Sequence, residues 1–231
     1  VDSDRAQEAL HRYRQLARTG TRDERLQAIE ALVGIDHERA AKALVRHIAE
    51  DRSEPVAERA GAVLSGFRSE NAAVTACRGL KRFRGREHRE LLLLETIARM
   101  RNPASLPAFL HFCKHKDRRY RILAMEGLGR LGVPEAEAVE ALAPAVEQEK
   151  DFGLRITALT ALARTPHKEA VPLLLKAAAV PGRIQRTALR GLMLLTGQEL
   201  GAQPGPWQAW WEQAEADFAI DVEAVRARSL D

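Results

Sequence analysis

Apolar residues recur along the chain at the spacing of an amphipathic helix, and this pattern itself repeats. In each copy an anchor residue, usually alanine, is followed four positions later by leucine or isoleucine, so both lie on one helical face. The anchors are Ala28, Ala60, Leu93, Ala124, Ala158 and Ala188, and their partners are Leu32, Leu64, Ile97, Leu128, Leu162 and Leu192. Successive anchors are 32, 33, 31, 34 and 30 residues apart. The pattern predicts the first helix of six repeats.

A second apolar segment follows the first helix in most copies. These segments are residues 40–49, 72–80, 106–113, 136–146 and 170–179. Glycine or proline separates several of them, as at Gly34 and Pro166, and no stretch keeps the two-residue alternation of a strand. Two helices per repeat, stacked side by side, are typical of a solenoid. We therefore predict an all-α fold, an α-solenoid that forms a right-handed α-α superhelix of about six HEAT-like helical pairs.

Two copies carry a longer signature. Asp117-x-x-x-Arg121-x-x-Ala124-x-x-x-Leu128 has the same form as Asp151-x-x-x-Arg155-x-x-Ala158-x-x-x-Leu162. The signature resembles the short HEAT-like repeat of bacterial HEAT-repeat proteins, first noted in phycobilisome lyases, and the resemblance covers residues 21–197. We expect its Asp and Arg to pair along the helix and with the neighbouring repeat. The resemblance implies an armadillo-like stack with a binding role, since such repeats serve many binding functions.

The two ends of the chain are expected to cap the repeats. Residues 1–20 form an N-terminal capping helix, amphipathic over 3–18, that covers the first repeat. Residues 198–231 form a Trp-rich C-terminal cap and tail, with Trp207, Trp210 and Trp211 on one helical face. This Trp-x-x-Trp-Trp ending is similar to one found in bacterial HEAT-repeat proteins. A box for an aromatic ligand is the alternative interpretation of the indoles, and residues 214–231 form either a last helix or a tail.

Charge is modest overall but concentrated in the middle of the chain. The net charge is +4, whereas residues 78–121 hold thirteen Lys and Arg against four acidic residues. In HEAT-type stacks the second helices line the concave surface, and equivalent positions on or near these helices carry basic residues or histidine. They are Arg46, Arg78, Lys81, Arg82, His111, Lys114, His115 and Lys176. We expect this stripe to bind an acidic partner, and the alternative is a solvated helix surface with many salt bridges.

No motif in the chain points to catalysis or to a bound cofactor. His111 and His115 stand at i and i+4, which suits one metal ion, but no further ligand completes the shell and Lys114 and Lys116 flank the pair. The sequence has no Gly-x-Ser-x-Gly elbow and no glycine-rich phosphate loop. We therefore expect no catalytic residues, no metal and no cofactor.

These features favour a non-enzymatic scaffold or adaptor for protein–protein interaction. We expect its concave face to bind a protein partner through an acidic surface or segment. The alternative is a nucleic-acid-binding HEAT-repeat protein that uses the basic zone Arg78–Arg121, where aromatic residues for base stacking are few. The longest apolar run is too short to cross a bilayer, so no membrane insertion is expected. We expect a soluble, cytoplasmic protein and leave open a targeting segment before Val1, the oligomeric state and the identity of the partner.

Overall fold

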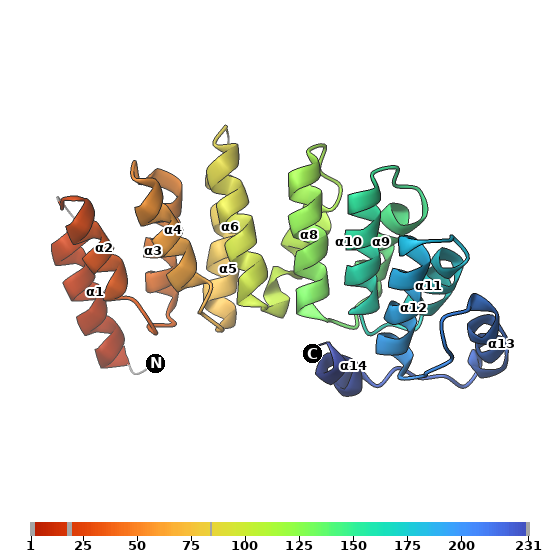
Figure 1. The fold of residues 1–231 in the computed structure, drawn as a ribbon. Coiled ribbons are helices and arrows are strands. Elements are labelled where there is room, and N and C mark those ends of the chain that lie inside the picture. Colours follow the sequence, from red (N-terminus) through yellow and green to blue (C-terminus); the bar gives the residue numbers. More distant parts are fainter. Residues whose placement is uncertain (1–2, 18–19, 84, 230–231) are drawn as a thin grey trace. The chain divides into compact units, whose positions relative to one another are not determined.

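The computed structural model describes residues 3–17, 20–83 and 85–229, which belong to two compact units (Figure 1). Within these ranges the chain forms fourteen α-helices, two short 3-10 helices and no strand, which confirms the predicted all-α class. The first unit ends at Pro107 and the second begins at Ala108. Arg84, which belongs to the predicted basic zone, lies outside the described residues.

The first unit consists of two layers of helices. One layer contains α2 (Arg22–Glu30), α4 (Glu54–Leu64) and α6 (Glu87–Met100), and α4 packs on both of its neighbours. The other layer contains α1 (Ser3–Ala17), α3 (Glu38–Glu50) and α5 (Glu70–Gly79). The 3-10 helix η1 (Leu80–Arg82) continues α5, and η2 (Pro103–Ser105) packs against α5. Each helix of one layer thus has a partner in the other, because α1 packs on α2, α3 on α4 and α5 on α6.

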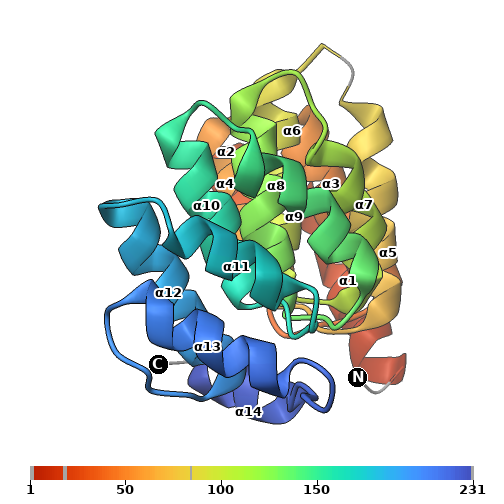
Figure 2. The same ribbon diagram turned by 90° about the vertical axis from the view of Figure 1, so that its right-hand side faces the viewer.

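The second unit has the same two-layer order. One layer contains α8 (Arg118–Leu131), α10 (Phe152–Ala163) and α12 (Arg183–Thr196), with α10 packed between the other two. The other contains α9 (Ala136–Glu147), α11 (Ala170–Ala178) and α13 (Pro204–Ala214), as the view in Figure 2 shows. The short α14 (Val222–Arg228) packs on α12, and α7 (Leu106–Phe112) spans the boundary between the units.

The helix positions predicted from the sequence agree with the structure. The second segments of the repeats become α3, α5, α7, α9 and α11, with ends that differ by a few residues at most. All twelve anchor and partner residues, from Ala28 and Leu32 to Ala188 and Leu192, are completely buried. The structure describes the N-terminal helix over Ser3–Ala17, and residue 18 of the predicted helix lies outside the described residues. Part of the segment 214–231 is helical as α14. No helix among the described residues is both long and apolar enough to cross a bilayer.

The Asp and Arg of the repeat signature do not pair along the helix as expected but bind backbone groups near its start. Asp117 and Asp151 are N-caps whose carboxylates accept hydrogen bonds from the backbone N–H groups of Arg119 and Leu154. Arg121 instead donates to the carbonyl groups of His115 and Lys116 at 3.0 and 2.9 Å. Between helices the partners also differ from the expected ones: Asp151 Oδ2 lies 3.2 Å from Nη2 of Arg118, which is not a signature residue, and Arg121 Nη2 lies 3.6 Å from Glu149 Oε2. In this signature the Asp caps the start of the helix, and the Arg donates hydrogen bonds to the turn before it.

Candidate functional site

Three of the basic residues predicted in the first unit lie together. Arg78 is on α5, and Lys81 and Arg82 follow on η1; all three side chains are exposed. Arg78 and Arg82 line a groove of about 220 Å³ between α3 and α5. Its other lining residues are Glu38, Lys42, Val45, Thr75 and Gly79. We call this the α3–α5 groove.

The basic side chains of the α3–α5 groove have no electrostatic partner in the part of the chain that the structure describes. Neither Lys42, Arg78 nor Arg82 forms an ion pair there, and the adjacent Lys81 forms none either. One carboxylate, that of Glu38, also lines the groove. Lys42 was not among the predicted residues, although it stands four positions before Arg46 on the same helix. The groove therefore offers more positive charge than its own residues neutralise.

Arg46 does not belong to this groove. Its Nε lies 2.9 Å from Glu50 Oε2, one turn further along α3, and its side chain lines a different groove between α1 and α3. An exposed pair at this spacing contributes little to stability. The grouping of Arg46 with Arg78 in one stripe stays a prediction, and in the structure the two side chains line different grooves.

The predicted residues of the second unit include two that already have partners. Lys176 Nζ lies 2.7 Å from Glu147 Oε1. His115 Nδ1 accepts a hydrogen bond from the backbone N–H of Asp117, and its ring lies 4.2 Å from that of Tyr120. His111 and Lys114 are exposed. The stripe across repeats thus stays a prediction, with Lys176 and His115 less available to a ligand.

The surroundings of His111 and His115 do not favour a metal ion. One nitrogen of His115 is engaged by the backbone, as described above. Burial raises the pKa of the nearby Cys113 thiol to about 12, so this sulfur stays protonated and is a poor ligand. Among the described residues no group of three or more His, Cys, Asp or Glu side chains is arranged to hold a metal ion.

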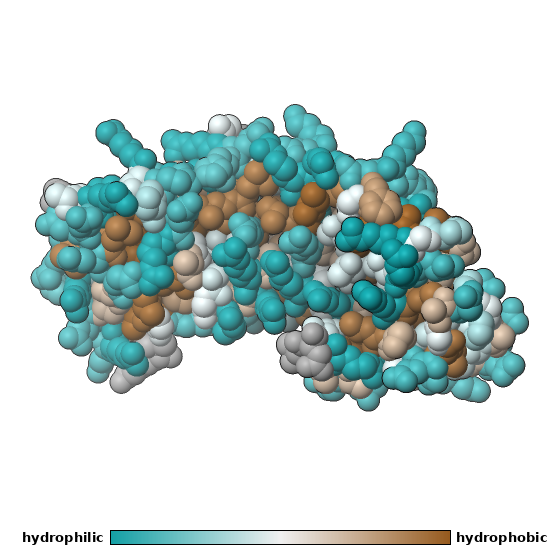
Figure 3. All heavy atoms as spheres, viewed as in Figure 1, coloured by the Kyte–Doolittle hydropathy of each residue, from teal (hydrophilic) through white to brown (hydrophobic). Residues whose placement is uncertain are grey.

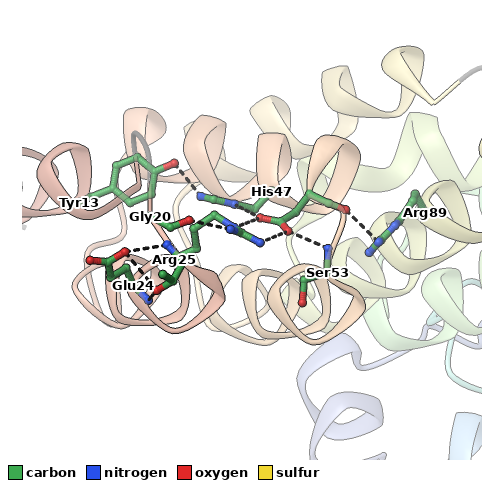
Figure 4. Close-up of polar contacts among 9 residues, drawn as sticks. Tyr13, Gly20, Glu24, Arg25, His47, Ser53 and Arg89 are labelled. Carbon is green, nitrogen blue, oxygen red and sulfur yellow. Dashed lines mark hydrogen bonds and ion pairs between the residues drawn. The ribbon is translucent and has the colours of Figure 1, made fainter.

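A polar network links α1 and α3, and no sequence pattern predicts it (Figure 4). Tyr13 Oη lies 2.9 Å from His47 Nε2, and His47 Nδ1 lies 3.1 Å from Asp51 Oδ2. Arg25 donates to both oxygens of Asp51, at 2.9 and 3.1 Å. His47 and Asp51 stand one helical turn apart, whereas Tyr13 is 34 residues from His47 and Arg25 is 26 residues from Asp51. The network as a whole therefore depends on helix packing. A groove of about 920 Å³, lined in part by Tyr13, His47 and Asp51, opens beside them.

The electrostatics of this network fix protonation states instead of activating a nucleophile. Burial lowers the pKa of His47 by more than the hydrogen bond to Asp51 raises it, so the imidazole is neutral near pH 7. Burial tends to raise the pKa of Asp51, but hydrogen bonds from Arg25, Ser53 and His47 lower it overall. Burial also raises the pKa of Tyr13, so its phenol stays protonated. The network therefore fastens α1 to α3, and we assign it a structural role.

Comparisons with known proteins identify no family for the chain. No family model and no curated protein matches it. Among solved structures, it is similar to an engineered protein known from a crystal structure, with 15% identity, 98% of both chains covered and a TM-score of 0.38. This similarity is too distant to inform the function.

Proposed function

We propose that the protein is a HEAT-like α-solenoid, a right-handed superhelix of about six helical pairs capped at both ends, that serves as a non-enzymatic scaffold for an acidic segment of a protein partner. The α3–α5 groove is the proposed site in the first unit. One observation carries the proposal: Lys42, Arg78 and Arg82 line one groove and form no ion pair within the described residues. In the second unit, the exposed His111 and Lys114 remain proposed contacts by their equivalent repeat positions.

The chemistry of the α3–α5 groove suits carboxylates. Two guanidinium groups can each hold a carboxylate through paired N–H donors, and an ammonium group adds a third positive charge. Val45 and Thr75 also line the groove, but Val45 is only 3% exposed, so a ligand would meet mainly the charged groups. Charges of this kind accelerate encounter and select the partner more than they add affinity.

The burial of the aromatic residues favours a protein ligand over nucleic acid. Phe83, Phe109, Phe112 and Tyr120 lie in or beside the basic zone, and all four are buried. A single strand is usually held by bases stacked on exposed aromatic rings, which these residues do not offer. Nucleic-acid binding remains the alternative proposal, and it would rest on phosphate contacts alone.

The proposal predicts that charge reversal in the α3–α5 groove abolishes binding of an acidic peptide. The variant carries Lys42→Glu, Arg78→Glu and Arg82→Glu, and the probe is a labelled peptide of mixed glutamate and aspartate followed by fluorescence anisotropy. The side chains are on the surface, so stability should change by about 0.5 kcal/mol or less at each position. A matched control reverses Arg12, Arg22 and Arg52, which are exposed and form no ion pair among the described residues.

Equal loss of binding in both triple variants would show that net charge alone matters and would contradict the proposed site. Unchanged binding in the groove variant would also contradict it. A short DNA duplex of random sequence is the competing probe. Tight binding of the duplex that persists at physiological salt, and that the groove variant removes, would favour the nucleic-acid alternative.

A further inference from the structure

A second groove lies between α10 and α12, and the described residues that line it include four arginines and no acidic residue. Arg183, Arg186 and Arg190 are exposed on α12, and Arg164 is half-buried at the end of α10. The volume of the groove is about 460 Å³. Its floor is partly apolar, with contributions from Ile156, Ala163 and Leu194. In Figure 3 strongly hydrophilic groups lie beside apolar ones over the region of α10 and α12. We call this the arginine groove.

The arginine groove differs from the other contacts between neighbouring helices of the same layers. Arg59 of α4 pairs with Glu30 of α2, and Arg89 of α6 lies 3.0 Å from Glu54 of α4. In the second unit Arg118 of α8 pairs with Asp151 at the start of α10. Each of these junctions has a carboxylate that faces an arginine.

At the α10–α12 junction no carboxylate of the described residues pairs with the four arginines. Within the ranges that the structure covers, the side chains of Arg164, Arg183, Arg186 and Arg190 form neither an ion pair nor a hydrogen bond. Four guanidinium groups in one groove repel one another, and their attraction for an anion is correspondingly large. The carboxylate that completes the other junctions is missing here, so the groove is suited to receive carboxylates from another molecule.

The spacing of the arginines matches an extended peptide. The positions 183, 186 and 190 lie on one face of α12, and at 1.5 Å per residue Arg186 and Arg190 are separated by about 6 Å along the axis. Successive side chains of an extended strand point to opposite faces, so those on one face are ~6.6 Å apart. An acidic residue at every second position would therefore face the arginines, while the residues between them face the apolar floor.

The shape of the groove disfavours a nucleic-acid duplex. The groove lies between two helices packed directly against each other, whose axes are typically about 8 to 10 Å apart. The groove is therefore a furrow over two helices in contact, and an extended chain can follow it along their axes. A duplex is much wider, so its phosphates would meet only the outer arginines and would leave Ile156 and Leu194 uncovered.

We propose that the arginine groove is a second binding site, independent of the α3–α5 groove, for an extended protein segment in which acidic and apolar residues alternate. From Arg183 to Leu194 the groove follows α12 over roughly 16 Å, which is about five residues of extended chain. Arg186 and Arg190 at its centre hold the acidic side chains through paired N–H donors.

The test uses two labelled peptides of the same composition, one with alternating glutamate and valine and one with the two residues in separate blocks. Fluorescence anisotropy should show that the intact protein binds the alternating peptide more tightly. The double variant Arg186→Gln and Arg190→Gln should bind it about tenfold or more weakly. The melting temperature of this variant should stay the same or rise, because two like charges are removed from the groove.

Two matched double variants separate this inference from the proposed function. Arg22→Gln with Arg52→Gln removes the same charge from exposed positions outside both grooves, and it should leave binding unchanged. Arg78→Gln with Arg82→Gln tests the α3–α5 groove alone. If only that pair weakens binding of the alternating peptide, the arginine groove is not a site, whereas the proposed function stands. If only the Arg186 and Arg190 variant weakens binding of this peptide, the arginine groove is a site and the α3–α5 groove is not.

Other results would also overturn the inference. These are no binding of the alternating peptide, equal binding of the block peptide, equal loss in the Arg22 and Arg52 control, and a lower melting temperature of the groove variant. A DNA duplex that binds more tightly than the peptide, and that the same groove variant releases, would assign the arginines to phosphate contacts instead.

Discussion

The tautomer of His47 follows from the hydrogen bonds on its two ring nitrogens. An ionised Asp51 carboxylate can only accept, so the proton of the neutral imidazole lies on Nδ1 and points to Asp51. Nε2 is then an acceptor, and the Tyr13 hydroxyl donates to it. A second proton on the ring would occupy Nε2 and break this arrangement. The residues themselves are visible in the sequence, but their meeting is not, because it requires α1, α2 and α3 to be packed first.

We predict that acid weakens the fold through His47. Its pKa in the folded protein is below the usual 6.5, so as the pH falls below about 6.5 the unfolded chain takes up a proton that the folded chain resists. The free energy of unfolding should therefore decrease between pH 7 and pH 5. His47→Gln, which cannot titrate, should show a shallower decrease in melting temperature followed by circular dichroism. The exposed His111→Gln is the control and should behave as the wild type does. A wild-type slope in His47→Gln would contradict this assignment.

At the scale of the helices, the sequence predicts what depends on local spacing. The repeat period places the first and second helices, and the twelve anchor and partner residues are buried as expected. The predicted pairing of the signature Asp and Arg along the helix is wrong, because Arg121 donates to the backbone carbonyls of His115 and Lys116, which no sequence pattern displays. The same position is occupied by Arg25, Arg155 and Gln185, which donate to carbonyl groups of Gly20, Val146 and Ala178. These three long side chains therefore link the start of the helix to the preceding helix or turn by hydrogen bonds.

Close contact between α8 and α10 requires glycine at position 129. A Cβ atom there would lie 2.9 Å from the Cα of Ala161, which is backbone and cannot move aside cheaply. We predict that Gly129→Ala lowers the free energy of unfolding by roughly 1 to 3 kcal/mol, measured by chemical denaturation. Gly205→Ala is the control, because a Cβ at that position meets nothing within 4 Å. If Gly129→Ala is as stable as the control, the two helices are not packed this closely.

At the scale of the whole chain, a linear count of charge finds one cationic region and misses another. Residues 78–121 stand out in the sequence because their basic residues are close together along the chain. The four arginines of the arginine groove are spread over positions 164–190 on two helices, so they gather only when α10 and α12 pack. Conversely, Arg46, His115 and Lys176 belong to the predicted stripe by position but already have partners. Helix packing decides which charged side chains lack an ion-pair partner. The sequence predicts where the helices lie better than it predicts which side chains they bring together.

The proposed solenoid makes a prediction about the dimensions of the protein in solution. A compact globular chain of this length has a radius of gyration of about 17 Å. Stacked helical pairs instead add roughly 9 to 10 Å each along one direction, so six pairs extend over about 60 Å. We expect small-angle X-ray scattering to give a radius of gyration of about 20 Å, with a distance distribution that peaks at short distances and has a long tail. A radius near 17 Å with a symmetric distribution would contradict the solenoid. It would leave the two-layer packing within each unit intact, because that packing does not depend on how the units are arranged.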